Sequence, residues 1–170
     1  TGVGTEAGAA VVLDVNTGEV LACASHPTYN LATFNEDYSK LAENEAKPLW
    51  NRAVSGTYTP GSTFKPLVAI AALQEGKLDP SETIYDKGVY EEYETYQPAC
   101  WIWQENHTTH GSLNVSSAIE HSCNYFFYEV GNRTGIDIID DYATKFGFGQ
   151  LTGVELTEEQ QRKIVNLLMA

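Results

Sequence analysis

Two short apolar runs near the start of the chain predict a β-hairpin. Residues 9–15 read Ala-Ala-Val-Val-Leu-Asp-Val, residues 19–25 form a second β-prone run, and Asn16-Thr17-Gly18 joins the two with turn-forming residues. The first run is apolar almost throughout and does not alternate. A strand of this kind is typical of a sheet with both faces covered, so we expect cover on both faces, including a helix on one of them.

A nearly continuous apolar stretch, residues 62–74, predicts a central helix. It follows the turn dipeptide Pro60-Gly61 and ends before Gly76. Because apolar residues occupy all sides of this helix, we expect it to be buried. We expect Ser62 to be its N-cap, in which case Pro66, which has no N–H, leaves only the Ser62 carbonyl without a partner.

Polar segments flank the central helix on both sides. Residues 26–50 are expected to be a loop with a short helix over 38–45. Residues 76–98 are expected to be a loop whose tyrosines are half-buried in local packing.

Four helices are expected in the second half of the chain. Asn114 is a suitable N-cap for a helix over 115–121, and a second helix over 124–130 should stop at Gly131-Asn132. Apolar residues at helical spacing predict an amphipathic helix over 136–146. The capping box Thr157-Glu158-Glu159-Gln160 predicts a last short amphipathic helix.

The composition fits one globular domain. The chain has 170 residues, 42% of them hydrophobic and 19% charged, which is enough for a sizeable core. Its formal net charge of −13 argues against a nucleic-acid or anionic-membrane surface, because these would repel it. No apolar run approaches the roughly 18 residues of a membrane span, and the chain does not open with a signal peptide.

The cysteines and histidines match no common metal-site pattern. Cys23, Cys100 and Cys123 are widely spaced and form no C-x-x-C pair, so buried reduced thiols are expected rather than disulfides or a zinc site. His107 and His110 lack a nearby carboxylate or an H-E-x-x-H pattern. We therefore expect neither a metal nor a cofactor.

Ser62 and Lys65 form a candidate catalytic pair. Residues three apart on a helix share one face, so the two side chains lie within reach of each other. Burial disfavours the lysine ammonium and leaves an amine that can take the serine proton, and backbone N–H groups at the helix start suit an oxyanion. On the bare S-x-x-K spacing, the alternative is a simple cap at Ser62 with Lys65 extending to water.

The residues around this pair resemble a known family. Pro60-Gly61-Ser62-Thr63-Phe64-Lys65-Pro66, preceded by Asn51-Arg52-Ala53 and Tyr58, resembles the active-site serine segment of penicillin-binding proteins, especially the monofunctional (class B) transpeptidases. Ser122-Cys123-Asn124 resembles the S-x-N motif of that family and the S-D-N of class A β-lactamases. The alternative for Ser122 is capping at the helix junction.

Further segments share the resemblance, which continues to Leu156. They are the hairpin sequence Val12 to Ala22, the pairs Cys100-Trp101 and His110-Gly111, and residues 148–156. The third family motif, Lys-(Thr/Ser)-Gly, does not occur in the 170 residues. The resemblance thus implies that residues 1–156 are the N-terminal part of a transpeptidase domain and that residues 157–170 are an amphipathic helix outside the family pattern.

The fold class implied by the resemblance is α/β (α+β), a β-lactamase/transpeptidase-like fold in incomplete form. It would comprise the N-terminal β-hairpin of the central antiparallel sheet and a mainly helical subdomain around the buried active-site helix. An apolar strand on an open edge tends to pair with another chain. We therefore expect a homodimer, or residues 157–170 folded back as cover.

The activity implied by the resemblance is that of a serine-type D,D-transpeptidase, which cross-links peptidoglycan. Ser62 would attack the D-Ala-D-Ala carbonyl of a stem peptide, with Lys65 as its base. Ser122 would pass a proton to the leaving amine, and Asn124 would hold the substrate or position Lys65. β-Lactams would acylate Ser62, at the extracytoplasmic face of a bacterial membrane to which the whole protein is anchored. The 170 residues alone are expected to be inactive or very weak.

Two other functional classes remain open from the sequence. One is a hydrolase, either a β-lactamase or a D,D-carboxypeptidase, and the other is a noncatalytic β-lactam sensor. A class A β-lactamase requires a Glu-x-x-x-Asn loop, whose spacing occurs only at Glu120 to Asn124, where the asparagine already belongs to S-x-N. A sensor would retain Ser62 and Lys65.

Overall fold

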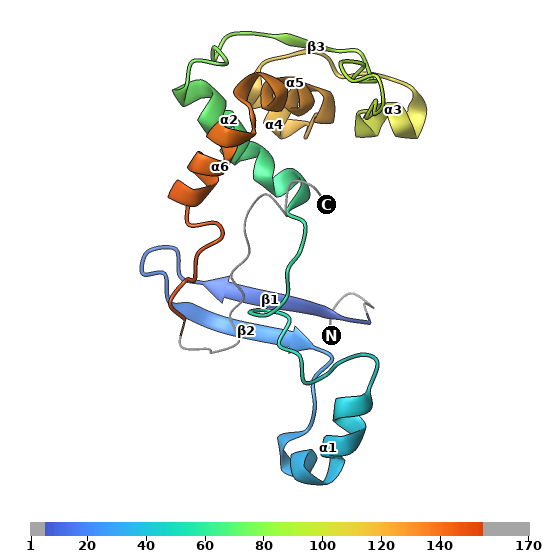
Figure 1. Cartoon of the computed structure of the whole chain (residues 1–170), viewed down its shortest axis with the longest axis vertical. Coiled ribbons are helices and arrows are strands. Elements are labelled where there is room, and N and C mark those ends of the chain that lie inside the picture. Colours follow the sequence, from blue (N-terminus) through green and yellow to red (C-terminus); the bar gives the residue numbers. More distant parts are fainter. Residues whose placement is uncertain (1–5, 155–170) are drawn as a thin grey trace. The chain divides into compact units, whose positions relative to one another are not determined.

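The structure, a computed structural model, describes residues 6–154 (Figure 1). Its described residues form two compact units, 6–58 with 151–154 and 59–150. The first unit contains the strands β1 (Gly8–Leu13) and β2 (Val20–His26), the 3-10 helix η1 (Leu31–Thr33) and the helix α1 (Phe34–Glu43).

The predicted hairpin is confirmed. Strands β1 and β2 pair antiparallel from Gly8↔His26 to Leu13↔Val20, with an irregularity between Val12 and Leu13. The Asp14 carboxylate accepts the backbone N–H groups of Asn16 and Thr17 in the connecting turn. Local turn chemistry therefore fixes the register of this hairpin.

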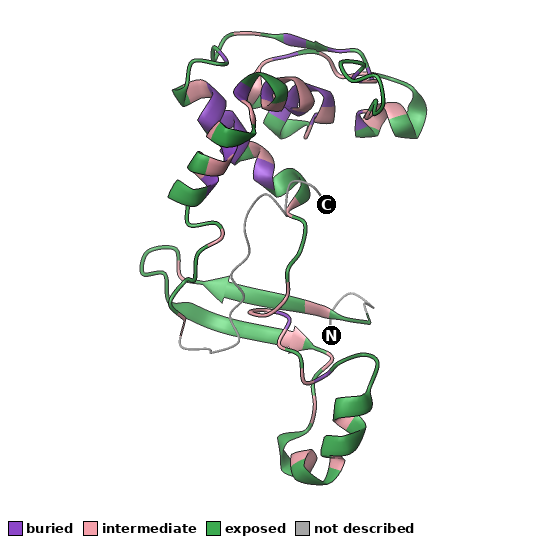
Figure 2. Ribbon diagram, in the orientation of Figure 1, coloured by how far each residue is buried: buried purple, intermediate pink, exposed green. Residues whose placement is uncertain are grey.

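The expected cover on both faces of the hairpin was wrong for the described part of the chain. Figure 2 shows both strands mostly exposed, and the Val12 side chain is 51% exposed. Among residues 6–154 the sheet has only these two strands. An apolar strand indicates that other elements should pack on its faces, but the strand itself does not provide those elements.

The first helix begins earlier than predicted, at Phe34 instead of residue 38. The Asn30 side chain accepts the Ala32 N–H and starts η1, which runs directly into α1. The start signal therefore lies upstream of the segment that has the helical pattern.

The second unit contains most of the helices. In chain order its elements are η2 (Gly61–Phe64), α2 (Lys65–Gln74), β3 (Ile84–Asp86), α3 (Trp101–Asn106), β4 (Gly111–Leu113), α4 (Val115–Glu120), α5 (Asn124–Thr134) and α6 (Ile136–Lys145). Strands β3 and β4 pair antiparallel, with Tyr85 opposite Ser112.

The start of the central helix differs from the prediction that Ser62 is its N-cap. Ser62 lies inside the 3-10 turn η2, and the N-cap of α2 is Phe64. Pro66 has no N–H to donate to the Ser62 carbonyl, and the Lys65 N–H donates to it instead. The carbonyl therefore has a partner, and the tighter turn is the consequence of the proline.

Helix α2 is the centre of the buried core, as predicted. Five of its ten residues are buried, while Ile70 is 39% exposed. Phe126 and Val130 of α5 are each 1% exposed, and Ile139 and Ala143 of α6 complete the same cluster. Helices α2, α5 and α6 thus share one buried core.

The outcomes for the later helices are mixed. Asn114 caps α4 in a capping box with Ser117, as predicted. Helix α5 was predicted to stop at Gly131-Asn132, but it continues to Thr134, because the left-handed glycine that ends it is Gly135, with φ 81°. Helix α6 is confirmed.

The segment after α2 contains structure that the sequence patterns did not predict. Strand β3 lies in a segment expected to be a loop, and α3 and β4 were not foreseen. Tyr90 is 3% exposed and packs against Tyr125, whereas Tyr93 and Tyr96 are exposed. Half-buried packing therefore does not describe these tyrosines as a group.

Two expectations concern the chain ends and membranes. The helix predicted for residues 157–170 lies outside the described residues. Within residues 6–154, none of the helices has the length and apolar character needed to cross a bilayer.

Candidate active site

Lys65 is held by the Ser122-Cys123-Asn124 segment. Its Nζ lies 2.6 Å from Asn124 Oδ1, 2.7 Å from the Ser122 carbonyl oxygen and 3.1 Å from Ser122 Oγ. The Phe127 ring centroid is 5.7 Å from the same nitrogen. Three of the four residues expected in the site are therefore joined by hydrogen bonds across 57 and 59 positions of sequence.

The turn between α4 and α5 presents these acceptors to Lys65. The Ser122 N–H donates to Ile119 O at 3.0 Å and the Cys123 N–H to Ala118 O at 2.9 Å, so the chain folds back on the end of α4. Ser122 has φ 49°, a left-handed conformation that costs free energy in a residue other than glycine. The Cys123 side chain caps α5 by accepting the Phe126 N–H.

Ser62 stands one 3-10 turn before Lys65 and is exposed. Among the described residues, no hydrogen bond joins its hydroxyl to Lys65 or Ser122. The structure thus brings Lys65, Ser122 and Asn124 together and leaves the Ser62 hydroxyl accessible. An accessible hydroxyl suits a group that has to contact a substrate carbonyl.

Burial lowers the pKa of the Lys65 ammonium from its usual 10.5. Three hydrogen-bond acceptors around Nζ match the three N–H bonds of the charged form. Burial therefore favours the neutral amine, while the three acceptors stabilise the ammonium that forms when the amine gains a proton. A general base that accepts and later releases a proton needs both the neutral amine and the ammonium to be accessible.

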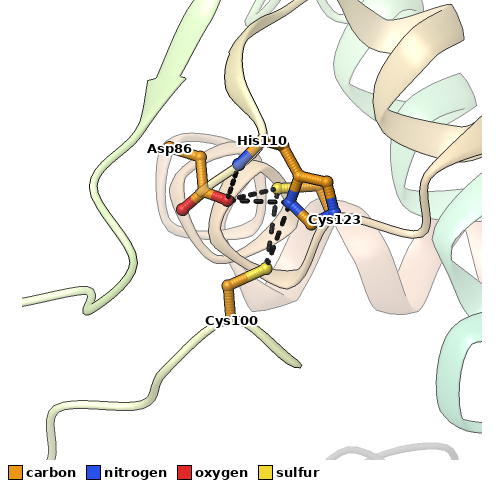
Figure 3. Close-up of side chains that lie close together, drawn as sticks. All are labelled: Asp86, Cys100, His110 and Cys123. Carbon is orange, nitrogen blue, oxygen red and sulfur yellow. Dashed lines mark hydrogen bonds and ion pairs between the residues drawn. The ribbon is translucent and has the colours of Figure 1, made fainter. Parts of the chain in front are cut away.

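A second polar cluster lies next to this site (Figure 3). It consists of Asp86 at the end of β3, Cys100 before α3, His110 before β4, and Cys123. His110 Nδ1 lies 2.8 Å from Asp86 Oδ2 and 3.6 Å from Cys100 Sγ. Cys123 Sγ lies 3.6 Å from Asp86 Oδ2 and 3.9 Å from Cys100 Sγ. Cys123 thus belongs to both groups.

The cluster is buried, and the pKa values of Asp86 and Cys123 are shifted. The side chains of Asp86 and His110 are 1% and 5% exposed. Burial alone would raise the pKa of Asp86, but backbone N–H groups of His110 and Gly88 donate to its carboxylate, and the net pKa is lowered. Burial raises the pKa of the Cys123 thiol to about 12. Asp86 is therefore an anion and Cys123 a thiol in the metal-free protein.

The four side chains could hold a divalent metal ion. One donor atom from each lies within 4.8 Å of all the others. In a tetrahedral zinc site with Zn–S bonds of about 2.3 Å, two thiolates lie about 3.8 Å apart, close to the 3.9 Å between Cys100 Sγ and Cys123 Sγ. The donor set of two sulfurs, one imidazole and one carboxylate suits Zn²⁺.

The sequence patterns missed this cluster for a structural reason. Its members stand 14, 10 and 13 positions apart and come from four elements, so no short motif contains two of them. The expectation of buried cysteines holds for Cys100 and Cys123 but was wrong for Cys23, which is exposed. Cys23 lies in β2, whose side chains have little cover among the described residues.

Comparison with known proteins agrees with the motifs. The model of the penicillin binding protein transpeptidase domain matches residues 8–165. The peptidoglycan D,D-transpeptidase MrdA of Acinetobacter baumannii is 40% identical over 160 residues, which cover 91% of this chain and 23% of that protein. The chain therefore spans about a quarter of the length of this relative.

Solved structures give the same result. Penicillin-binding protein 2 of Pseudomonas aeruginosa, in complex with WCK 5153, is 33% identical, with a TM-score of 0.81 over 93% of this chain and 36% of that one. Penicillin-binding protein A of M. tuberculosis, as an imipenem acyl-enzyme complex, is 29% identical, with a TM-score of 0.79 over 92% and 38%. The fold is therefore part of the α/β transpeptidase fold, and the chain belongs to the penicillin-binding protein transpeptidase domain family.

Proposed function

We propose that the chain is the serine-bearing part of a peptidoglycan D,D-transpeptidase. The observation that carries this proposal is the hydrogen-bonded group of Lys65, Ser122 and Asn124 beside an accessible Ser62. The name of the A. baumannii relative states this activity. The substrate is the D-Ala-D-Ala end of a stem peptide, and β-lactams acylate the same serine.

Each residue of the group has a distinct role in this proposal. Lys65 takes the proton of Ser62 as the hydroxyl attacks the carbonyl carbon, which forms an acyl-serine and frees an amine. The distance of 3.1 Å from Lys65 Nζ to Ser122 Oγ gives the proton a direct path to Ser122, which delivers it to the leaving amine. Asn124 Oδ1, 2.6 Å from Nζ, holds the lysine in place.

The acyl-serine is then resolved by an amine of a second stem peptide. This acceptor step separates a transpeptidase from a hydrolase, in which water resolves the same intermediate. A β-lactam adduct on Ser62 should accordingly be long-lived. Rapid release of the adduct would support a β-lactamase instead.

The setting of the enzyme is part of the proposal. Peptidoglycan cross-linking takes place at the extracytoplasmic face of the bacterial membrane, and we place the protein there, anchored to that membrane. The 170 residues contain no Lys-Thr-Gly or Lys-Ser-Gly. In the family that this chain resembles, the strand with this motif supplies one oxyanion N–H. On their own the 170 residues should therefore acylate very poorly, because removal of one oxyanion donor typically costs about 100- to 1,000-fold.

Covalent labelling tests the proposal. In the full-length gene product, Ser62→Ala should abolish labelling by a fluorescent penicillin, because the attacking oxygen is removed. Ser116→Ala is a matched control, since Ser116 is exposed on α4 and has no place in the group. Normal labelling of Ser62→Ala, or equal loss of labelling in the control, would reject Ser62 as the nucleophile.

A further inference from the structure

A cavity of about 430 Å³ lies in the second unit, where β3 packs against α5 (Figure 1). Its wall comes partly from β3 and the residues that follow this strand, and partly from α5. The volume is within the range of about 300–1,000 Å³ that is usual for small-molecule sites. All of the lining residues fall between positions 83 and 133, so the cavity belongs to one unit.

The cavity lies on a different face of α5 from the one that contacts Lys65. Tyr125 and Glu129 line the cavity, and residues four apart share one face of a helix. Asn124 and Phe127, which contact the Lys65 ammonium, are three apart and share another face. The cavity is therefore separate from the group around Lys65.

Hydrogen bonds between side chains fix the aromatic wall of the cavity. The Tyr90 hydroxyl donates to Glu129 Oε2 at 2.8 Å and accepts from Asn132 Nδ2 at 3.3 Å. The Tyr93 hydroxyl donates to Asn132 Oδ1 at 2.8 Å. The Tyr90 and Tyr125 rings meet edge to face, with their centroids 5.4 Å apart. The loop after β3 is thus held against α5 at several points.

Tyr125 carries a hydroxyl for which the second unit supplies no partner. The residue lines the cavity and is 8% exposed, yet its hydroxyl makes no hydrogen bond to residues 6–154. A buried hydroxyl without a partner costs free energy, which a ligand that bonds to it recovers. Burial raises the pKa of this hydroxyl, and the charges of Glu129, Glu91 and Glu92 also raise it. The hydroxyl is therefore neutral, and its oxygen is available as an acceptor.

The uncompensated charge of the wall is negative. Arg133 forms ion pairs with two carboxylates, one of them that of Glu129, each at 2.6 Å. Its charge is therefore already matched. Lys87 is the remaining cation of the wall. Glu91 and Glu92 are exposed, and neither carboxylate has an ion-pair partner in the part of the chain that the structure describes. Two unpaired carboxylates thus stand against one lysine.

We propose that this cavity binds a primary ammonium group carried on an alkyl chain. Glu91 and Glu92 attract the positive charge. The rings of Tyr90 and Tyr125 provide apolar contact for the alkyl carbons and are favourable neighbours of a cation. The Tyr125 hydroxyl oxygen accepts one of the three ammonium N–H bonds.

Other classes of ligand fit this wall less well. An anionic ligand would be repelled by the two unpaired carboxylates, and an apolar ligand would leave the Tyr125 hydroxyl without a partner. An alkyl ammonium group occurs both on free diamines and on lysine-type side chains of peptides. The site recognises the chemistry that these two sources share.

Isothermal titration calorimetry of the full-length gene product with 1,5-diaminopentane tests the proposal. Saturable binding is expected, with a Kd of about 1 mM or tighter. Glutarate and 1,5-pentanediol have the same chain length, and neither should bind measurably. Raising the ionic strength from about 0.05 M to about 0.5 M should weaken the diamine, because salt screens exposed carboxylates.

A second titration distinguishes the two sources of the ammonium group. The probe is the amide of Nα-acetyl-lysine, which carries one ammonium on a peptide-like unit. Affinity at least equal to that of the diamine would assign the site to a peptide side chain. Binding of the diamine alone would assign it to a free amine.

Matched variants locate the binding in the cavity. Tyr125→Phe keeps the ring and removes the hydroxyl, so it should weaken diamine binding about 2- to 10-fold. Glu92→Gln removes one unpaired charge and should weaken it about 2- to 5-fold. Glu105→Gln is the control, since Glu105 is an exposed carboxylate of α3 outside the wall. Thermal melting shows whether each variant is folded, and penicillin labelling of Glu92→Gln should equal that of the parent protein.

Four results would overturn the proposal. They are the absence of saturable diamine binding, equal affinity for glutarate, unchanged affinity in both folded cavity variants, and displacement of the diamine by penicillin, which would move the amine to the group around Lys65. The binding measurements do not depend on covalent labelling. A protein that binds the diamine but is not labelled by penicillin would reject only the proposed transpeptidase function.

Discussion

Val12 of β1 is 51% exposed, whereas Ala71 and Ala72 of α2 are 0% exposed, although both segments are almost wholly apolar. In the second unit, α5 and α6 supply apolar faces that cover α2. Lys65 stands at the start of α2, and the two buried cysteines lie in the chain between α2 and α5. In the first unit, nothing among the described residues plays this part for the hairpin. Apolar content therefore indicates how much cover a segment needs, while topology decides whether it receives it.

The largest expected effect is a cavity in the covered unit. Phe126 is 1% exposed and packs beside Phe127 on α5. Phe126→Ala should lower the free energy of unfolding by about 3–5 kcal/mol, because it loses both burial and packing. Phe146→Ala is the control, since Phe146 is 56% exposed at the end of α6. Equal losses in denaturant titrations would contradict the contrast between covered and uncovered positions.

A smaller effect is expected at Gly88, in the turn that follows Asp86 of the second polar cluster. Gly88 has φ 87°, and a Cβ at this position would lie 2.2 Å from the Trp103 ring. Gly88→Ala should cost about 2–4 kcal/mol through left-handed strain and overpacking together. Gly76→Ala provides the control, because Gly76 has φ 63° and open space around its Cβ direction. If both variants unfold at the same denaturant concentration, the contact with Trp103 carries no cost.

The sequence predicted the parts of this molecule whose signals are local. The hairpin turn and the cap at Asn114 are each contained in a few residues, and each is present. The pairing of β3 with β4, by contrast, joins segments about 27 positions apart, and neither strand exceeds three residues. The resemblance to a family named Ser122 and Asn124 and gave positioning of Lys65 as one of two roles for Asn124. The hydrogen bond from Lys65 to Asn124 Oδ1 fits that role.

The same reasoning explains the helix ends and the missed cluster. Gly131 and Gly135 are equivalent as sequence signals, and only the backbone shows that Gly135 is the one with positive φ. Asp86 and Cys100 each look like ordinary loop residues in the sequence. Their chemistry arises because β3, α3, β4 and α5 bring them together with His110 and Cys123.

The third prediction concerns catalysis in the covered unit. Lys65→Ala should slow acylation by a fluorescent penicillin at least about 100-fold, the usual cost of losing a general base. The measurement is the second-order rate constant in the full-length gene product. Lys145→Ala is the control, because Lys145 is an exposed residue of α6 paired with Asp141. A rate for Lys65→Ala within a few-fold of the parent rate would remove Lys65 from the mechanism.

The pH dependence of the same reaction should sharpen this assignment. Burial lowers the pKa of Lys65, so the neutral amine appears at lower pH than in a free lysine. Because the neutral amine is the base, the acylation rate should rise with pH and level off below pH 10.5, the usual lysine pKa. A rate that is flat between about pH 6 and pH 10, or one that falls over this range, would contradict a lysine base.

The smallest effect on stability is expected for a substitution in the hairpin. There the substitution should change the association of the chain with a second copy instead. Val12 pairs with Ala22 and is half exposed, so Val12→Lys should change the free energy of unfolding by only about 0.5 kcal/mol.

Both outer edges of the two-stranded sheet lack a further strand among the described residues, and such edges pair with other chains. The 170-residue chain should therefore form a homodimer through this hairpin, and the added lysine should disfavour it, since an edge charge has to be desolvated on pairing. Light scattering over a range of concentrations measures both chains. A monomer for the parent chain, or a dimer that Val12→Lys leaves unchanged, would show that the exposed strands are not an association surface.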